Sequence, residues 1–231
     1  MQLPLGVQLR DDTTFANFHA GPNRALIEML DQPDMNRALA VESPLYLYGE
    51  SGSGCSHLLQ ASCHQIDRLG GRSSYLPLDE LICYPPRIIE GFEVLDLVCL
   101  DAIEAIGGNR WWEEAIFNLF NELRENRKRL MVAAKLPPRQ LQFDLPDLTS
   151  RLSWGLVYQM LPLDDNDKLQ SLRLRAHLRG IDLSTEVARF ILNRSPRDMK
   201  GLFAVLLQLD SASLRAKRKL SIPFVKEVMN W

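Results

Sequence analysis

The chain has 231 residues, of which 46% are hydrophobic and 24% charged, and its formal net charge is −2. These values are ordinary for a globular protein with one large domain, or with a medium domain and a small one. A pI near 6.1 gives no sign of a nucleic-acid-binding surface, and no apolar run reaches the ~20 residues that span a bilayer. The four cysteines have no zinc spacing, so we expect a cytoplasmic protein whose Cys63, Cys83 and Cys99 are buried and reduced.

Apolar runs alternate with helical patterns along residues 13–162. Continuous apolar runs indicate strands that are covered on both faces, and helices between them indicate right-handed βαβ units. The sequence therefore predicts a three-layer αβα domain with a five-stranded parallel sheet. Its strands are expected at residues 45–48, 74–78, 95–101, 129–134 and 156–161, and its clearest helices at residues 56–69 and 111–126.

The pattern changes after Pro162, because no further strand follows. Several of the remaining segments begin with Asp, Ser or Pro, which helix N-termini favour. We expect a small all-α domain over residues 163–231, while residues 1–12 form a tail that belongs to neither domain. Its helices are predicted at residues 164–179, 184–193, 196–212 and 222–230.

A glycine-rich turn joins the first predicted strand to the first long helix. It fits the phosphate-binding pattern G-x-x-x-x-G-K-[ST], except that a cysteine replaces the lysine. Backbone N–H groups of such a turn surround a phosphate, and the helix N-terminus adds a positive dipole end. We expect the turn to hold a nucleotide without the charge that reaches its β- and γ-phosphates. The candidate residues are Gly49, Glu50, Ser51, Gly52, Ser53, Gly54, Cys55, Ser56 and His57.

Asp101 closes a predicted apolar strand, as the Walker B acid does in P-loop proteins. It either caps the next turn or, with Ser56, supports Mg²⁺. Hydrolysis would also need a second acid after Asp101 and a polar group at the end of the next strand. Ala102 and Lys135 stand there instead, and because positioned charges carry most of phosphoryl-transfer catalysis, we expect negligible turnover. Whether Lys135 replaces the missing loop lysine stays open.

Two arginines are candidates for contact with phosphate. Arg151 lies in the segment Ser-Arg-Leu-Ser-Trp-Gly at residues 150–155, in a short helix before the last strand. Arg197 is expected in the first turn of a helix, where a cation opposes the helix dipole unless an anion is nearby. The alternative for Arg151 is a solvated or salt-bridged arginine, and without the upstream motifs Arg197 would be read as a surface residue.

Aromatic residues have two interpretations each. Phe15 and Phe18 either flank a nucleobase or belong to the core. Trp111 and Trp112 begin a helix, where burial is favoured over a place in an interface.

In this order, the motifs resemble the AAA+ domain of the DnaA family of bacterial replication initiators. The resemblance covers about residues 13–231, and the segment at residues 150–155 is its most specific match. Because the sequence stops before the DNA-binding domain of DnaA, it is similar to the Hda family of short regulators that inactivate DnaA. The tail segment Gln2-Leu3-Pro4-Leu5 looks like the peptide by which replication proteins dock on the sliding clamp.

This resemblance implies an AAA+ fold followed by a helical lid, with Arg197 of the lid facing the nucleotide. It implies ADP as a structural ligand with Mg²⁺ support, and Arg151 as an arginine finger that stimulates hydrolysis of ATP bound to DnaA. Re-initiation would thereby be prevented, and DNA would be reached only through the clamp. The alternative is a clamp-loader-like or other AAA+ scaffold without effect on a partner's ATP; homo-oligomers fit either interpretation, and an autonomous ATPase is disfavoured.

Overall fold

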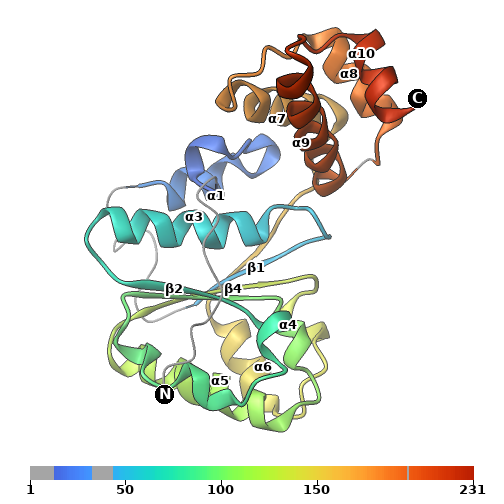
Figure 1. Ribbon diagram of the computed structural model, residues 1–231. Coiled ribbons are helices and arrows are strands. Elements are labelled where there is room, and N and C mark those ends of the chain that lie inside the picture. Colours follow the sequence, from blue (N-terminus) through green and yellow to red (C-terminus); the bar gives the residue numbers. More distant parts are fainter. Residues whose placement is uncertain (1–12, 33–43, 197) are drawn as a thin grey trace. The chain divides into compact units, whose positions relative to one another are not determined.

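The structure is a computed structural model that describes residues 13–32, 44–196 and 198–231 (Figure 1). The expected clamp-binding peptide, Gln2-Leu3-Pro4-Leu5, and the expected lid arginine, Arg197, lie outside these residues. The chain divides into two compact units with separate cores. The sheet unit contains Asn23–Glu50 and Gly54–Leu161 with residues 13–16, and the helical unit contains Asn17–Pro22, Ser51–Ser53 and Pro162–Trp231.

A five-stranded sheet forms the middle layer of the sheet unit, and every pair of neighbouring strands in it is parallel. The strand order is β2-β3-β4-β1-β5, so β1 lies between β4 and β5. The predicted five-stranded parallel sheet is confirmed. The strands are β1 (Leu45–Tyr48), β2 (Ser73–Pro77), β3 (Leu97–Asp101), β4 (Arg129–Ala134) and β5 (Leu156–Gln159).

The bounds of β1 and β4 agree with the prediction, whereas β3 begins two residues later than expected. Asp96, which the prediction included in β3, instead links the residues that precede β2 and β4. Its carboxylate accepts hydrogen bonds from the Arg72 backbone at 2.9 Å and from Lys128 Nζ at 2.8 Å. The pKa of Asp96 is lowered by the Lys128 hydrogen bond and then by the Arg72 backbone.

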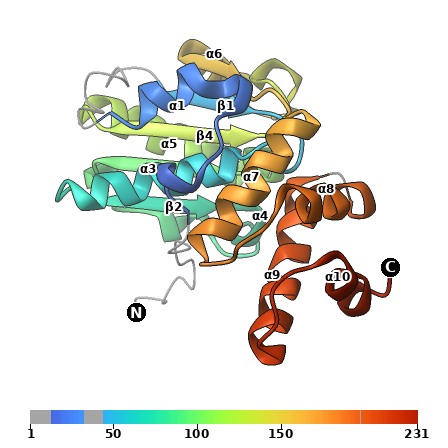
Figure 2. The same cartoon turned by 90° about the horizontal axis from the view of Figure 1, so that it is seen from above.

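Helices cover both faces of the sheet. Figure 1 shows α1 (Arg24–Leu30) and α3 (Cys55–Arg68) on one face, and α4 (Leu78–Leu81), α5 (Arg110–Glu125) and α6 (Pro146–Trp154) on the other. Seen from above, the strands run beneath α1 and α3 (Figure 2). Short 3₁₀ turns complete the unit's connections at Phe15–Asn17, Gly21–Asn23, Pro86–Ile89, Phe92–Val94, Ile103–Ile106 and Pro138–Gln140.

Helix α5 packs against the sheet through residues at helical spacing. Trp112, Ile116 and Leu119 are buried in the core between α5, α6 and the sheet. The two tryptophans at its start have opposite surroundings: Trp112 is 1% exposed and Trp111 is 77% exposed. The indole N–H of Trp112 donates to the Tyr84 carbonyl at 3.2 Å, which satisfies its one polar atom. The expected burial at the helix start holds for Trp112 alone.

Four helices build the core of the helical unit from leucine, isoleucine, valine and phenylalanine side chains. Helix α7 contacts α8 and α9, and α10 contacts α8 and α9. Ser184 and Ser221 cap the starts of α8 and α10 by accepting backbone N–H groups. The helices are α7 (Asp165–Leu178), α8 (Thr185–Arg194), α9 (Met199–Ala216) and α10 (Ile222–Met229).

The predicted start of α9 at Pro196 was wrong, because the helix begins at Met199. Asp198 is its N-cap, and the Asp198 side chain accepts the Gly201 backbone N–H at 2.8 Å. An aspartate at this position satisfies an N–H group that the first helical turn leaves without an internal partner.

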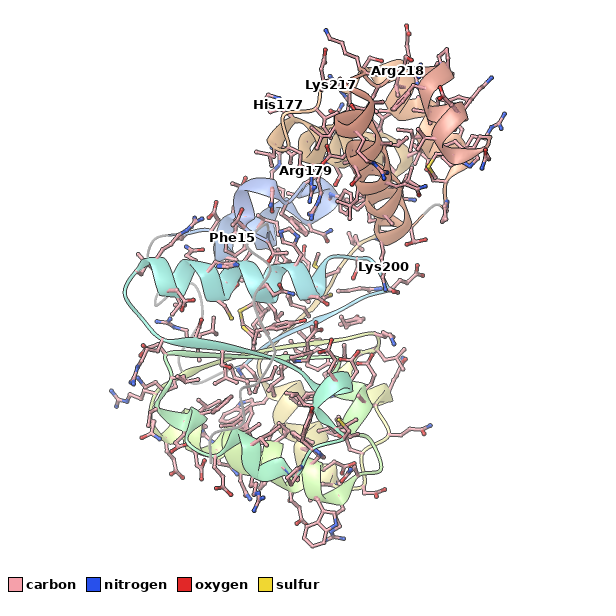
Figure 3. The ribbon with its side chains drawn as sticks, viewed as in Figure 1. Phe15, His177, Arg179, Lys200, Lys217 and Arg218 are labelled. Carbon is pink, nitrogen blue, oxygen red and sulfur yellow. The ribbon has the colours of Figure 1, made fainter. Side chains whose placement is uncertain are left out.

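The helical unit is rich in basic side chains: residues 162–231 contain 13 lysines and arginines against 8 aspartates and glutamates. Lys200 lies in the first turn of α9, and Lys217 and Arg218 follow the end of that helix (Figure 3). Arg179 pairs with Asp210 at 3.3 Å, and Arg218 pairs with Glu227 at 3.0 Å.

All four cysteines are free thiols. Cys63 and Cys99 are buried as predicted, and burial raises the pKa of Cys99. The prediction was wrong for Cys83, which is exposed and donates its thiol hydrogen to the Glu80 carbonyl. Within the described ranges, no helix is long and apolar enough to cross a membrane.

Candidate functional site

The glycine-rich turn leads from β1 directly into α3. The Gly49 N–H donates to the Ala134 carbonyl at 3.2 Å, which continues the β1–β4 pairing into the turn. Gly52 and Gly54 have φ values of 84° and 97°, which other residues rarely adopt. Gly54 is the N-cap of α3, and a glycine has no side chain to cover the helix N-terminus. The backbone therefore has the form of a phosphate-binding turn.

Asp101 lies at the end of β3 with its carboxylate 9% exposed. Its Oδ2 atom accepts the Tyr75 hydroxyl at 2.5 Å, and its Oδ1 atom accepts the Ala102 backbone N–H at 2.9 Å. The pKa of Tyr75 is raised, first by burial and then by the charge of Asp101, while hydrogen bonds from Gln60 and Ser56 act in the opposite direction. Tyr75 thus connects the loop serine, Ser56, with the strand-end acid, Asp101.

This arrangement fits a magnesium site of the P-loop type. Mg²⁺ is usually held by one or two carboxylates together with substrate phosphates, and a carboxylate oxygen can accept more than one hydrogen bond. Each Asp101 oxygen accepts one, so each retains a lone pair for a metal-bound water, and the Ser56 side chain is exposed. A cage of three or more His, Cys, Asp or Glu side chains is absent from the part of the chain that the structure describes.

Cys55 stands at the position of the missing lysine, and Glu104 and Lys135 follow two neighbouring strands of the sheet. Cys55 is the first residue of α3 and is buried. Glu104 follows β3, and its Oε1 atom lies 3.5 Å from Lys135 Nζ, just after β4. The pKa of Tyr46 is raised first by burial and then by the charges of Glu104 and Cys55. The Glu104 Oε2 atom is buried and has no hydrogen-bond partner among the described residues.

The residues before α1 pack onto the loop helix α3. A ring nitrogen of His57 is hydrogen-bonded to the Thr14 carbonyl at 2.9 Å, and the Thr13 hydroxyl donates to Gln60 at 3.1 Å. Phe15 is buried, as the core interpretation predicts, and Phe18 is half-buried (Figure 3 labels Phe15). His57 thus already has one structural role besides its candidate contact with phosphate.

Arg151 belongs to a second cluster, on the face of the sheet opposite α3 (Figure 1). Its guanidinium carbon lies 5.7 Å from the ring centre of Trp154 and 5.9 Å from that of Phe120. Arg124 lies over the same Trp154 ring at 4.2 Å. Trp154 is 48% exposed, and its ring lies close to two guanidinium groups. The negative face of the indole ring attracts these cations.

Two shallow cavities adjoin Arg151. One, of about 380 Å³, is lined by Phe117, Asp147, Ser150, Arg151 and Trp154. The other, of about 530 Å³, is lined by Asn121, Arg124, Glu125 and Arg151. Arg151 is the residue that the two cavities share, so solvent or a partner can approach it from either side.

The helix that carries Arg151 is fixed at both ends. Glu113 of α5 is fully buried, and its two carboxylate oxygens accept the backbone N–H groups of Gly108 at 2.9 Å and of Leu145 at 2.7 Å. Leu145 is the N-cap residue of α6. At the other end stands Gly155, where an added Cβ would lie 1.9 Å from the Pro44 carbonyl oxygen.

Sequence reasoning selected the loop, Asp101 and Arg151, but it missed the side chains that hold them. Tyr75, Glu113 and Arg124 reach their partners from other elements, whereas Trp154 contacts Arg151 from the same helix. A signal was present for Trp154, which lies three residues after Arg151 on the same helical face. The partners of Tyr75 and Glu113 depend on the fold.

Two family models match the chain. Residues 165–229 match the model described as the lid domain of Hda, and residues 87–159 match the model of the ATPase domain of bacterial DnaA. The chain thus combines a DnaA-type ATPase segment at residues 87–159 with an Hda-type lid at residues 165–229. The predicted resemblance is confirmed, and the DnaA match contains both Asp101 and Arg151.

Solved structures share this AAA+ fold. Domain III of the replication initiation protein DnaA from Thermotoga maritima matches 97% of this chain and 98% of its own, with a TM-score of 0.80 and 22% identity. DnaA from Aquifex aeolicus, bound to AMPPCP, matches 91% of this chain and 70% of its own, with a TM-score of 0.71 and 23% identity. The Thermotoga maritima RuvB Holliday junction branch migration motor matches 94% of this chain and 73% of its own, with a TM-score of 0.62 and 14% identity.

Proposed function

We propose that this AAA+ protein stimulates hydrolysis of ATP bound to a partner, the replication initiator DnaA, and so prevents re-initiation. The contrast between its two candidate sites carries the proposal. The loop keeps its glycines and Ser56, but Cys55 and Ala102 replace groups that turnover requires. Arg151, in contrast, is partly exposed between two cavities and supported by aromatic rings.

In this proposal, Arg151 acts as an arginine finger in trans. The charge that develops during phosphoryl transfer is stabilised best by a cation whose position is already fixed. Trp154 and Phe120 contact the Arg151 guanidinium and limit its rotation, so less reorganisation is needed when it meets phosphate.

The protein's own nucleotide is proposed to be ADP, held as a structural ligand by residues 49–57. Backbone N–H groups of the turn and of the α3 start would receive its phosphates. Ser56 and Asp101 would hold a Mg²⁺ ion through its water shell, and Arg197 would approach from the lid. A bound diphosphate supplies negative charge at the start of α3, which offsets the helix dipole.

Docking is proposed to occur through Gln2, Leu3, Pro4 and Leu5 on the sliding clamp, in the cytoplasm. DNA would then be reached only through the clamp. A homo-oligomer is compatible with this arrangement, because a finger needs a neighbouring nucleotide.

The test is the rate of ATP hydrolysis by DnaA in the presence of clamp-loaded DNA and this protein. Wild-type protein should accelerate it, and Arg151→Ala should reduce the acceleration by ~10³-fold or more, as for other arginine fingers. Arg139→Ala removes an exposed arginine of the same unit and should change nothing. No acceleration by the wild-type protein would refute the proposal.

The scaffold alternative has one observation in its favour. Trp154, Leu156 and Leu161 are large apolar side chains that are about half exposed along the β5 edge, as at surfaces that bind partners. If the protein only binds partners, Arg151→Ala will leave both partner binding and partner hydrolysis unchanged.

A further inference from the structure

Lys135 lies beside the phosphate-binding turn because of the strand order. Strand β4 pairs with β1, and Ala134 is aligned with Tyr48. Gly49 and Lys135 directly follow these two strands, and the Gly49 N–H donates to the Ala134 carbonyl. Neighbouring strands are about 4.8 Å apart, so the lysine side chain begins at the edge of the turn.

The Lys135 side chain is held there only weakly. It is 68% exposed, and its Nζ atom lies 3.5 Å from Glu104 Oε1, which is longer than a charge-assisted hydrogen bond. Exposed ion pairs contribute little to stability, and a lysine ammonium moves easily on its flexible stem. The ammonium can therefore turn from Glu104 to a stronger acceptor at small cost.

Glu104 and Tyr46 both lie at the end of β4 where Lys135 stands. Glu104 pairs with Lys135, and the Tyr46 hydroxyl donates to the carbonyl of the following residue, Leu136, at 2.8 Å. Cys55 carries no charge that could meet a phosphate in the turn. The Glu104 Oε2 atom is buried and lacks a partner among the described residues, so a phosphate brought near this carboxylate would add negative charge beside negative charge unless a cation lies with it.

We propose that Lys135 supplies, to a nucleoside diphosphate in the turn, the positive charge that a P-loop ordinarily carries at the position of Cys55. The charge is provided by the strand next to the loop instead of by the loop itself. The inference rests on the nucleotide-bound state of the proposed function. It also explains how a turn with a neutral first helical residue accommodates an anion.

The experiment measures the affinity of the full-length, nucleotide-stripped protein for ADP by calorimetry. Lys135→Ala should weaken ADP binding by ~10–100-fold, the range of a charge-assisted hydrogen bond. Lys135→Arg should retain most of the affinity, and Arg139→Ala should match the wild type. Binding of adenosine, which has no phosphate, should be equal in all variants.

A second substitution tests the relocation of the charge. Cys55→Lys introduced into the Lys135→Ala protein should restore ADP affinity to within a few-fold of the wild type. Glu104→Gln separates phosphate contact from neutralisation of the carboxylate. If Lys135 touches phosphate, Lys135→Ala will still weaken binding in the Glu104→Gln background.

Two failures are distinguishable. A wild-type protein that does not bind ADP would overturn the proposed nucleotide-bound state and this inference with it. A wild-type protein that binds ADP, with Lys135→Ala unchanged or with its effect abolished by Glu104→Gln, would overturn this inference alone.

Discussion

The turn between β1 and α3 and the Arg151 cluster on α5 and α6 differ in how they place charge. At the turn, the backbone has the conformation that binds phosphate. Cys55 and Ala102 stand where a lysine and a second acid would carry charge. In the Arg151 cluster, two guanidinium groups lie close to the Trp154 ring. The fully buried Glu113 anchors the helix that carries Arg151.

The difference separates binding from catalysis. Backbone N–H groups and a helix dipole are sufficient to hold an anion, whereas acceleration of phosphoryl transfer depends on positioned side-chain charge. A protein that keeps the first at its own loop and the second on its surface is suited to act on a nucleotide that another subunit binds. The predictions below test each half of this comparison.

The largest effect should follow removal of the anchor of the arginine cluster. Glu113→Ala removes a fully buried carboxylate that accepts the Gly108 and Leu145 backbone N–H groups, and the loss of both hydrogen bonds should lower the free energy of unfolding by about 2–4 kcal/mol. Urea denaturation measures this loss. Glu114→Ala, which removes only an exposed pair with Arg110, should stay within about 0.5 kcal/mol of the wild type. Equal losses in both variants would contradict the anchoring role.

The next effect concerns Trp154 as a positioning residue. Trp154→Ala should reduce the stimulated rate of partner hydrolysis by ~10-fold, because Arg151 loses a ring that restricts it. The effect should fall on kcat of the stimulated reaction and leave the half-saturating protein concentration nearly unchanged. Trp154→Phe should recover most of the rate, and Trp111→Ala, at an exposed tryptophan, should have no effect. A loss confined to half-saturation would instead identify Trp154 as a docking residue.

A smaller effect is expected at the loop region. Tyr75→Phe removes the hydroxyl that donates to Asp101, and the free energy of unfolding should fall by about 1–2 kcal/mol. Stimulation of the partner should persist, because Arg151 lies in the other cluster. Tyr48→Phe is the matched control, since the Tyr48 hydroxyl makes only an exposed 3.4 Å contact with Gln159. A Tyr75→Phe protein as stable as the control would show that Asp101 does not depend on this phenol.

The smallest effect lies in neither region and provides a reference for both. The pKa of Asp96 is lower in the folded protein, so its stabilising contribution is complete above the unfolded pKa and is lost as pH falls through the folded value. Asp96→Asn should therefore flatten the decline of stability below about pH 4, where an unfolded aspartate titrates. Urea midpoints between pH 3 and pH 7 measure the slope, and an unchanged acid slope would contradict the assignment.

Continuous apolar runs made the sheet predictable, because β1 and β4 are buried on both faces and their bounds coincide with the runs. The start of α9 was less predictable: Pro196 and Asp198 both favour a helix start, and the side-chain hydrogen bond to Gly201 decides between them. The contacts that complete the candidate sites join residues far apart in sequence. Tyr75 and Asp101 are separated by 26 positions, and Glu113 and Leu145 by 32, so only the folded chain reveals them.

The segment Ser-Arg-Leu-Ser-Trp-Gly contains one residue, Gly155, that the fold itself requires. Its hydrogen atom leaves room for the Pro44 carbonyl oxygen, and any side chain there would force β1 and β5 apart. This requirement comes from folding and persists whatever the protein does. The role proposed for Arg151, four residues earlier, is functional instead. In relatives that no longer act on the partner, we expect position 151 to vary while position 155 remains glycine. A comparison of the two positions would then show where the activity was lost.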